Sequence, residues 1–148
     1  MRSRATNLLQ AAALFAGIVY LVVGSLFYLS PILFSRICGM DVGEDWLTEI
    51  PKDPLMSTLY YMATAFASLL GVTGASMVLP LFDPEKYRVL LYFTGAIFPG
   101  FAAVTLLRNG IRLGHPLLIV FGGVFLAICV VTVLGIAATR HAGRPGGR

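Results

Sequence analysis

Long apolar runs separated by short polar segments make up the pattern of this chain. Four stretches, residues 5–35, 54–82, 89–107 and 113–139, contain no Asp, Glu, Lys or Arg. A helix that crosses the hydrocarbon core of a bilayer needs about 20 mainly apolar residues, and each stretch meets or nearly meets that length. Core helices of a soluble bundle would carry a charged face, which these stretches lack. The pattern therefore predicts four membrane-spanning helices.

Aspartate and proline define the expected ends of these helices. Asp53 and Asp83 each precede a proline, an order typical of an N-cap followed by the first helical position. Short connections place consecutive helices next to each other in antiparallel directions. We expect an all-α membrane protein, a single domain built as an antiparallel bundle of four transmembrane helices. The expected segments are helices at about 5–29, 54–79, 84–107 and 116–139, an outer loop at 39–53 and a flexible C-terminal tail at 140–148.

Composition supports the membrane interpretation. Apolar residues make up 57% of the 148 positions and charged residues 12%, about half the share in a soluble domain. These values exclude a soluble enzyme, a nucleic-acid-binding domain, a disordered tail and a small secreted domain held by disulfides. Although the sequence pI is about 9.4, the basic residues are scattered at segment ends, so we expect no nucleic-acid partner.

The distribution of Lys and Arg predicts the orientation in the membrane. Cytoplasmic segments carry an excess of these residues. With the N-terminus inside, the inner side holds Arg2, Arg4, Lys86, Arg88, Arg140, Arg144 and Arg148. The outer side then holds Arg36, Lys52, Arg108 and Arg112. We therefore expect both termini in the cytoplasm.

The spans contain few residues that could perform chemistry. No acidic or basic residue lies deep in a span, which argues against proton-coupled transport, pumping and voltage sensing. His115 and His141 fall at opposite ends of one helix, and no paired-cysteine or HExxH motif occurs. Cys38 and Cys129 should lie too far apart for a disulfide, and we interpret them as unreactive thiols. We expect no catalytic residues, cofactor or metal.

A ridge of small residues marks the second predicted helix. Ala63, Ala67, Gly71 and Ala75 recur every four residues, a spacing that lets two backbones approach closely in lipid. This face packs either within the bundle or against another subunit. Similar ridges occur in the fourth and first helices, at Gly123, Ala127 and Gly135 and at Ala13 and Gly17.

The third predicted helix carries Pro99-Gly100 near its centre, which predicts a kink. Two interpretations remain open. The kink is either a structural bend filled by neighbouring side chains, or a hinge or a cavity between helices lined by Thr94, Phe98, Phe101 and Thr105.

The outer face offers the most site-like group of residues. Arg108, Arg112 and His115 are spaced to share one helix face, and Trp46 lies on the same side in the acidic loop. Val42, Trp46 and Ile50 recur every four residues, which predicts a short helix on the membrane with Trp46 at the interface. Three interpretations of the arginines remain open. They pair with acidic residues of the loop, they bind a lipid headgroup or anionic ligand, or they form a docking surface for a partner.

Short motifs at the helix ends resemble those of a known group. They are FYLSPILFSRICGM, DPLMSTLYYM, DPEKYR and RNGIRLGHP. Together they resemble the BphX-like group of small four-span bacterial membrane proteins. The resemblance implies a bacterial inner-membrane protein and carries no catalytic signature or site residues.

Two functions are consistent with the sequence. The first is an accessory or structural subunit of a larger membrane complex, without catalysis of its own, in contact with lipids and other integral-membrane subunits. The alternative is a binder or carrier of a lipid or hydrophobic small molecule. An enzyme would have to use the acidic loop with His115, the only candidate cluster.

Overall fold

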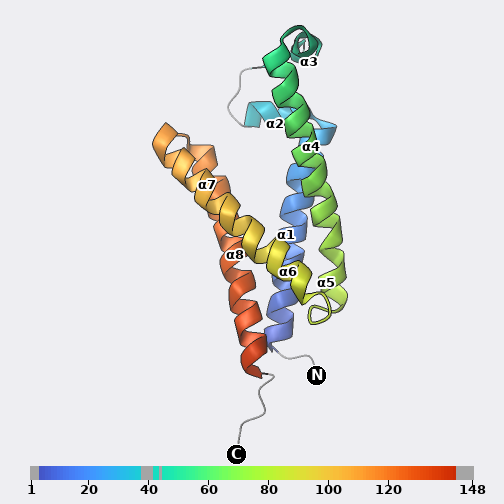
Figure 1. The fold of residues 1–148 in the computed structure, drawn as a ribbon, viewed down its shortest axis with the longest axis vertical. Coiled ribbons are helices and arrows are strands. Elements are labelled where there is room, and N and C mark those ends of the chain that lie inside the picture. Colours follow the sequence, from blue (N-terminus) through green and yellow to red (C-terminus); the bar gives the residue numbers. More distant parts are fainter. Residues whose placement is uncertain (1–3, 38–41, 44, 143–148) are drawn as a thin grey trace, which may run out of the picture. The chain divides into compact units, whose positions relative to one another are not determined.

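The computed structural model describes residues 4–37, 42–43 and 45–142, and most of these are helical with no β-strand among them. Each element is labelled in Figure 1 where there is room. In chain order the elements are α1 (Arg4–Leu29), α2 (Pro31–Ile37), α3 (Trp46–Glu49), the 3-10 helix η1 (Ile50–Lys52), α4 (Pro54–Ser76), α5 (Val78–Phe82), α6 (Arg88–Tyr92), the π-helix η2 (Phe93–Ile97), α7 (Phe98–Leu113) and α8 (Pro116–Ala142).

Four helical stretches of the described chain are long and apolar enough to cross a bilayer. They are Thr6–Leu29, Pro54–Phe82, Arg88–Leu113 and Pro116–Thr139. The prediction of an all-α protein with four membrane-spanning helices is confirmed. The chain is an integral membrane protein.

The chain divides into two compact units. The first comprises Met1–Gly17 and Ser76–Arg148, and the second comprises Ile18–Ala75. The helix α1 therefore contributes its first half to one unit and its second half to the other.

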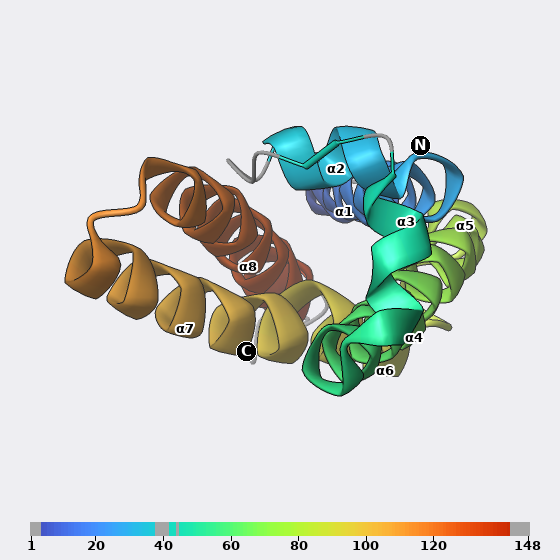
Figure 2. The same ribbon diagram turned by 90° about the horizontal axis from the view of Figure 1, so that it is seen from above.

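Within the first unit, α7 and α8 form a tight helical hairpin, with the two helices side by side in Figures 1 and 2. A Schellman motif ends α7: the His115 N–H bonds the Gly110 carbonyl at 2.9 Å, and the Gly114 N–H bonds that of Ile111 at 3.4 Å. Gly114 has φ +64°, a left-handed conformation that glycine adopts without steric cost. Pro116 then begins α8 as predicted, so only Gly114 and His115 separate the helices.

Small residues set the close packing in this unit. A Cβ on Gly110 would lie 2.8 Å from the Ile119 side chain, and one on Gly122 would lie 2.7 Å from that of Leu107. The first half of α1 also packs here, since a Cβ on Gly135 of α8 would lie 2.8 Å from Leu9. Glycine at these positions allows the helices to approach closely without a hydrophobic driving force.

The third span differs in detail from its predicted range. Asp83 accepts a bond from the Lys86 N–H at 3.0 Å, but residues 84–87 form a turn and the helix begins at Arg88. Its far end extends past residue 107 to Leu113. The last span continues through Ala142, whereas the rest of the predicted tail, residues 143–148, lies outside the described residues.

The predicted kink region contains the π-helix η2, which ends two residues before Pro99. The Phe98 N–H bonds the Phe93 carbonyl, five residues back. Proline has no N–H, and in an α-helix its ring would clash with the carbonyl four residues earlier, here that of Gly95. A π-turn widens the backbone at that carbonyl. The widened turn therefore accommodates Pro99 inside the membrane span.

The second unit contains the rest of α1, α2, α3, η1 and α4. Asp53 caps α4 as predicted, because its Oδ1 accepts bonds from the N–H groups of Leu55 at 2.8 Å and Met56 at 3.4 Å. Aromatic rings join the other elements of this unit. The Phe27 ring centroid lies 5.2 Å from that of Phe34 and 6.0 Å from that of Tyr60.

Candidate functional site

The predicted small-residue face of α4 is divided in the structure. Ala67 is buried and Gly71 half-buried, whereas Ala63 and Ala75 are exposed. The two central residues lie against α1, and the two outer ones do not share that contact.

Gly24 of α1 is the partner of this face. A Cβ on Gly24 would lie 2.6 Å from the Ala67 carbonyl oxygen and 2.7 Å from the Gly71 backbone nitrogen. Both contacts are with backbone atoms, which cannot move away as a flexible side chain can. The second half of α1 and α4 therefore cross at a point that admits only glycine at position 24.

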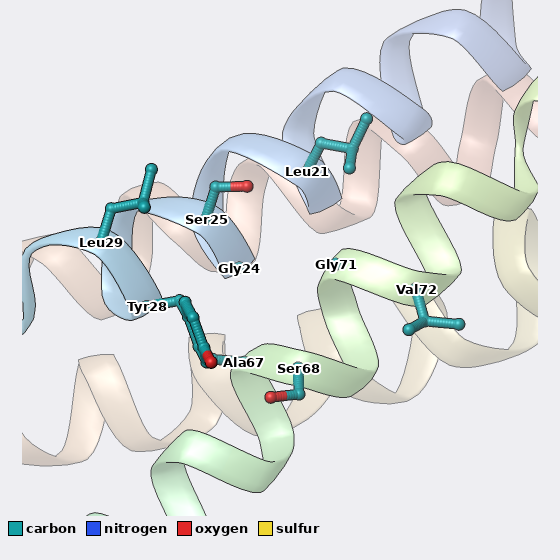
Figure 3. A pocket seen from close by; sticks show the side chains of 9 residues that line it. All are labelled: Leu21, Gly24, Ser25, Tyr28, Leu29, Ala67, Ser68, Gly71 and Val72. Carbon is teal, nitrogen blue, oxygen red and sulfur yellow. The ribbon is translucent and has the colours of Figure 1, made fainter.

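A groove lies beside this crossing, within the second unit. Its volume is about 490 Å³. It is lined from α1 by Leu21, Gly24, Ser25, Tyr28 and Leu29, and from α4 by Ala67, Ser68, Gly71 and Val72. In Figure 3 the small residues lie where the helices approach, and the Tyr28 side chain extends from α1 toward Ala67.

The groove is apolar except for three hydroxyl groups. They belong to Ser25, Tyr28 and Ser68. The Ser68 hydroxyl donates to the Thr64 carbonyl at 2.9 Å, a bond within its own helix. Ser25 and Tyr28 are both exposed residues that line the groove.

Trp46, a predicted site residue, lies in the second unit at the start of α3. Its ring is half-buried and packs edge-on against Tyr60, with centroids 6.0 Å apart. A helical turn is present where the loop pattern predicted one, as α3 followed by η1, and Ile50 is buried. The loop residues 38–41 and 44, with Cys38, Asp41 and Glu44, lie outside the described residues.

The other three predicted site residues belong to the first unit, at the α7–α8 turn. Arg108 and Arg112 are exposed on α7, one helical turn apart. His115 is half-buried, and its Nδ1 is buried without a hydrogen-bond partner in the described structure. The main chain of this residue is fixed by the Schellman bond to Gly110.

The four residues predicted to line a cavity at the kink do not share one environment. Thr94 and Phe98 are half-buried: the Thr94 hydroxyl donates to the Leu90 carbonyl and lies 3.1 Å from the Met77 sulfur, and Phe98 packs edge-on against Phe125. Phe101 and Thr105 are exposed, and Phe101 is 75% exposed.

The helical geometry accounts for this separation. Pro99 and Ala103 are buried, and each exposed residue lies two positions further on, about 200° around the helix. The interpretation in which these four residues line one cavity is therefore wrong.

The described residues offer no cluster for metal chemistry. No group of three or more His, Cys, Asp or Glu side chains among them could hold a metal ion. Cys129 is half-buried in α8, and its sulfur would lie 3.4 Å from a Cβ on Gly100. The arrangement is one of packing surfaces, a groove and a basic turn.

No protein-family model matches the chain, and no curated protein or solved structure is significantly similar to it. The resemblance of its turn motifs to the BphX-like group remains a prediction.

Two features of the second unit, Gly24 and the groove, were not among the predictions. Gly24 stands alone in α1 without a small residue four positions on either side, because Tyr20 and Tyr28 occupy those positions, so the ridge signal was absent. The groove depends on which faces of α1 and α4 meet. The residue pattern of either helix taken alone does not define those faces. A signal for Gly24 does exist: it is a glycine among mostly large residues in the second half of α1, where Ser25 is the other small residue.

Proposed function

We propose that this chain is an accessory subunit of a larger membrane assembly, without catalysis of its own. One observation carries the proposal: the groove beside the α1–α4 crossing. Its glycine and alanine floor and apolar rim are of the type that receives another transmembrane helix. The occupant that fits best is a partner's membrane helix with small residues facing the floor and a polar group reaching Ser25 or Tyr28.

The proposal includes location and orientation. The chain resides in a bacterial inner membrane with both termini in the cytoplasm. Support comes from the excess of Lys and Arg on the inner segments and from the resemblance of the turn motifs. Its contacts are lipids and other integral-membrane subunits.

Site-specific photocrosslinking tests the subunit role. A benzophenone amino acid is placed at Val72, which lines the groove and is 68% exposed, or at Met62, which lies elsewhere on α4 and is 67% exposed. After irradiation of native membranes, Val72 should give one discrete protein adduct and Met62 should give none. Equal diffuse labelling at both positions would contradict the proposal.

A groove-filling variant provides the second arm. Ser25→Phe inserts a ring into the groove and leaves the Gly24 crossing intact, so the partner should be lost on mild-detergent purification. Met62→Phe adds a ring outside the groove and should retain it. If the native chain purifies repeatedly as a lone monomer, the subunit role is excluded.

The groove hydroxyls favour a second candidate, a binder or carrier of a hydrophobic small molecule. A molecule with an apolar body and a hydroxyl or carbonyl group could pack against the apolar rim and form a hydrogen bond with Ser25. Native mass spectrometry of the purified chain should then show a small-molecule adduct that Ser25→Phe removes and Met62→Phe keeps. A small-molecule adduct without a protein crosslink at Val72 would favour this candidate over the subunit role.

A further inference from the structure

The arginines of the α7–α8 turn differ from the other basic residues of the described chain because their side chains have no polar partner in the protein. Elsewhere each described basic side chain has a partner. The Arg36 Nε donates to the Val42 carbonyl, Lys52 pairs with Glu49 at 2.6 Å, Lys86 lies over the Tyr87 ring and Arg88 contacts the Ile136 carbonyl. Arg108 and Arg112 make no hydrogen bond or ion pair within the described part of the chain.

The position of these two arginines favours a shared ligand. They lie four residues apart on α7, so their Cβ atoms are about 5–6 Å apart on one face. Both belong to the last turns of the third span, next to the start of the fourth. Guanidinium groups bind phosphate through paired N–H donors.

Two exposed apolar side chains lie beside the arginines. Ile111 is 73% exposed and Leu113 is 70% exposed, and both lie on the same turns of α7. The surface therefore combines a cationic pair with an exposed apolar flank at the end of a membrane span.

From this combination we infer that the α7–α8 turn binds the headgroup of an anionic phospholipid. The phosphate lies between Arg108 and Arg112, and the acyl chains lie along the apolar flank. Charge complementarity selects an anionic lipid over a zwitterionic one, and the apolar flank selects a lipid over a soluble phosphate. The inference is independent of the groove and of the proposed subunit role.

Native mass spectrometry of the purified full chain tests this site. The probes are phosphatidylglycerol and phosphatidylcholine, titrated in the same detergent. The native chain should retain phosphatidylglycerol preferentially, and Arg108→Gln/Arg112→Gln should reduce that preference about tenfold. Arg108→Lys/Arg112→Lys keeps both charges and should retain most of it.

Two controls separate this site from general electrostatics. Lys52→Gln removes a charge already paired with Glu49 and should leave the preference unchanged. Inorganic phosphate at millimolar concentration should not displace the lipid. An equal loss in Lys52→Gln, an unchanged preference in the double Gln variant, or displacement by inorganic phosphate would each overturn the inference.

Discussion

Gly24 shows how much one residue contributes to the second unit. Its missing side chain lets α1 reach the α4 backbone at Ala67 and Gly71. The Asp53 cap could be predicted because a cap depends on a few neighbouring residues. The importance of Gly24 could not be predicted, because it arises from α4 residues more than 40 positions away in sequence.

The two glycines at this crossing should respond differently to the same substitution. Gly24→Ala forces the helices apart and should lower the free energy of unfolding by about 1–3 kcal/mol. Gly71→Ala meets no atom within 4 Å and should be neutral or stabilising by up to about 1 kcal/mol, because alanine favours helix. Denaturation in mixed micelles measures both. Equal stability of the two variants would contradict the crossing geometry.

At the scale of elements, the π-helix η2 packs closely against α8 at Gly95 and Thr132. A Cβ on Gly95 of η2 would lie 2.7 Å from Cγ2 and 2.8 Å from Oγ1 of Thr132, which is fully buried. Threonine is branched at Cβ and has few rotamers in a helix, so it cannot turn away easily. Its hydroxyl has no hydrogen-bond partner in the described structure.

A double-mutant cycle should reveal an energetic coupling between Gly95 and Thr132. Gly95→Ala alone should destabilise the protein, because the new methyl group meets Thr132. Thr132→Ala removes both contacting atoms, so the double variant should recover most of the loss, with a coupling of about 1–2 kcal/mol. The free energy of unfolding of all four proteins measures it, and additive effects would show that the contact carries no energy.

The sequence predicted the existence of the helices better than their internal geometry. Pro99 predicted an irregularity, and a π-helix ends two residues before it. Tertiary packing determines that the irregularity takes the form of a π-helix. It also determines that Gly95, rather than Gly100, makes the closer contact with α8. The sequence predicted Arg108 and Trp46 as members of one group on the outer face, whereas the fold assigns them to different units.

At the scale of the whole molecule, the proposed orientation places Lys52 outside and Lys86 inside. Both are exposed in the structure. In a Cys38→Ser/Cys129→Ala background, Lys52→Cys should react with a membrane-impermeant maleimide added to intact spheroplasts. Lys86→Cys should react only after permeabilisation. The reverse labelling pattern would invert the topology and place the α7–α8 turn on the cytoplasmic side.

The two-residue connection between α7 and α8 has a consequence for biogenesis. With so little chain between them, the third and fourth spans have to enter the bilayer together as a hairpin. In the proposed orientation this hairpin carries Arg108 and Arg112 across the hydrocarbon core, where each arginine costs about 2.5–3.5 kcal/mol at the centre of a span. The span with the highest mean hydropathy of the four is Pro116–Thr139. The high hydropathy of this fourth span can offset the cost of the two arginines. The fourth span would therefore help the less apolar third span, Arg88–Leu113, to insert into the bilayer.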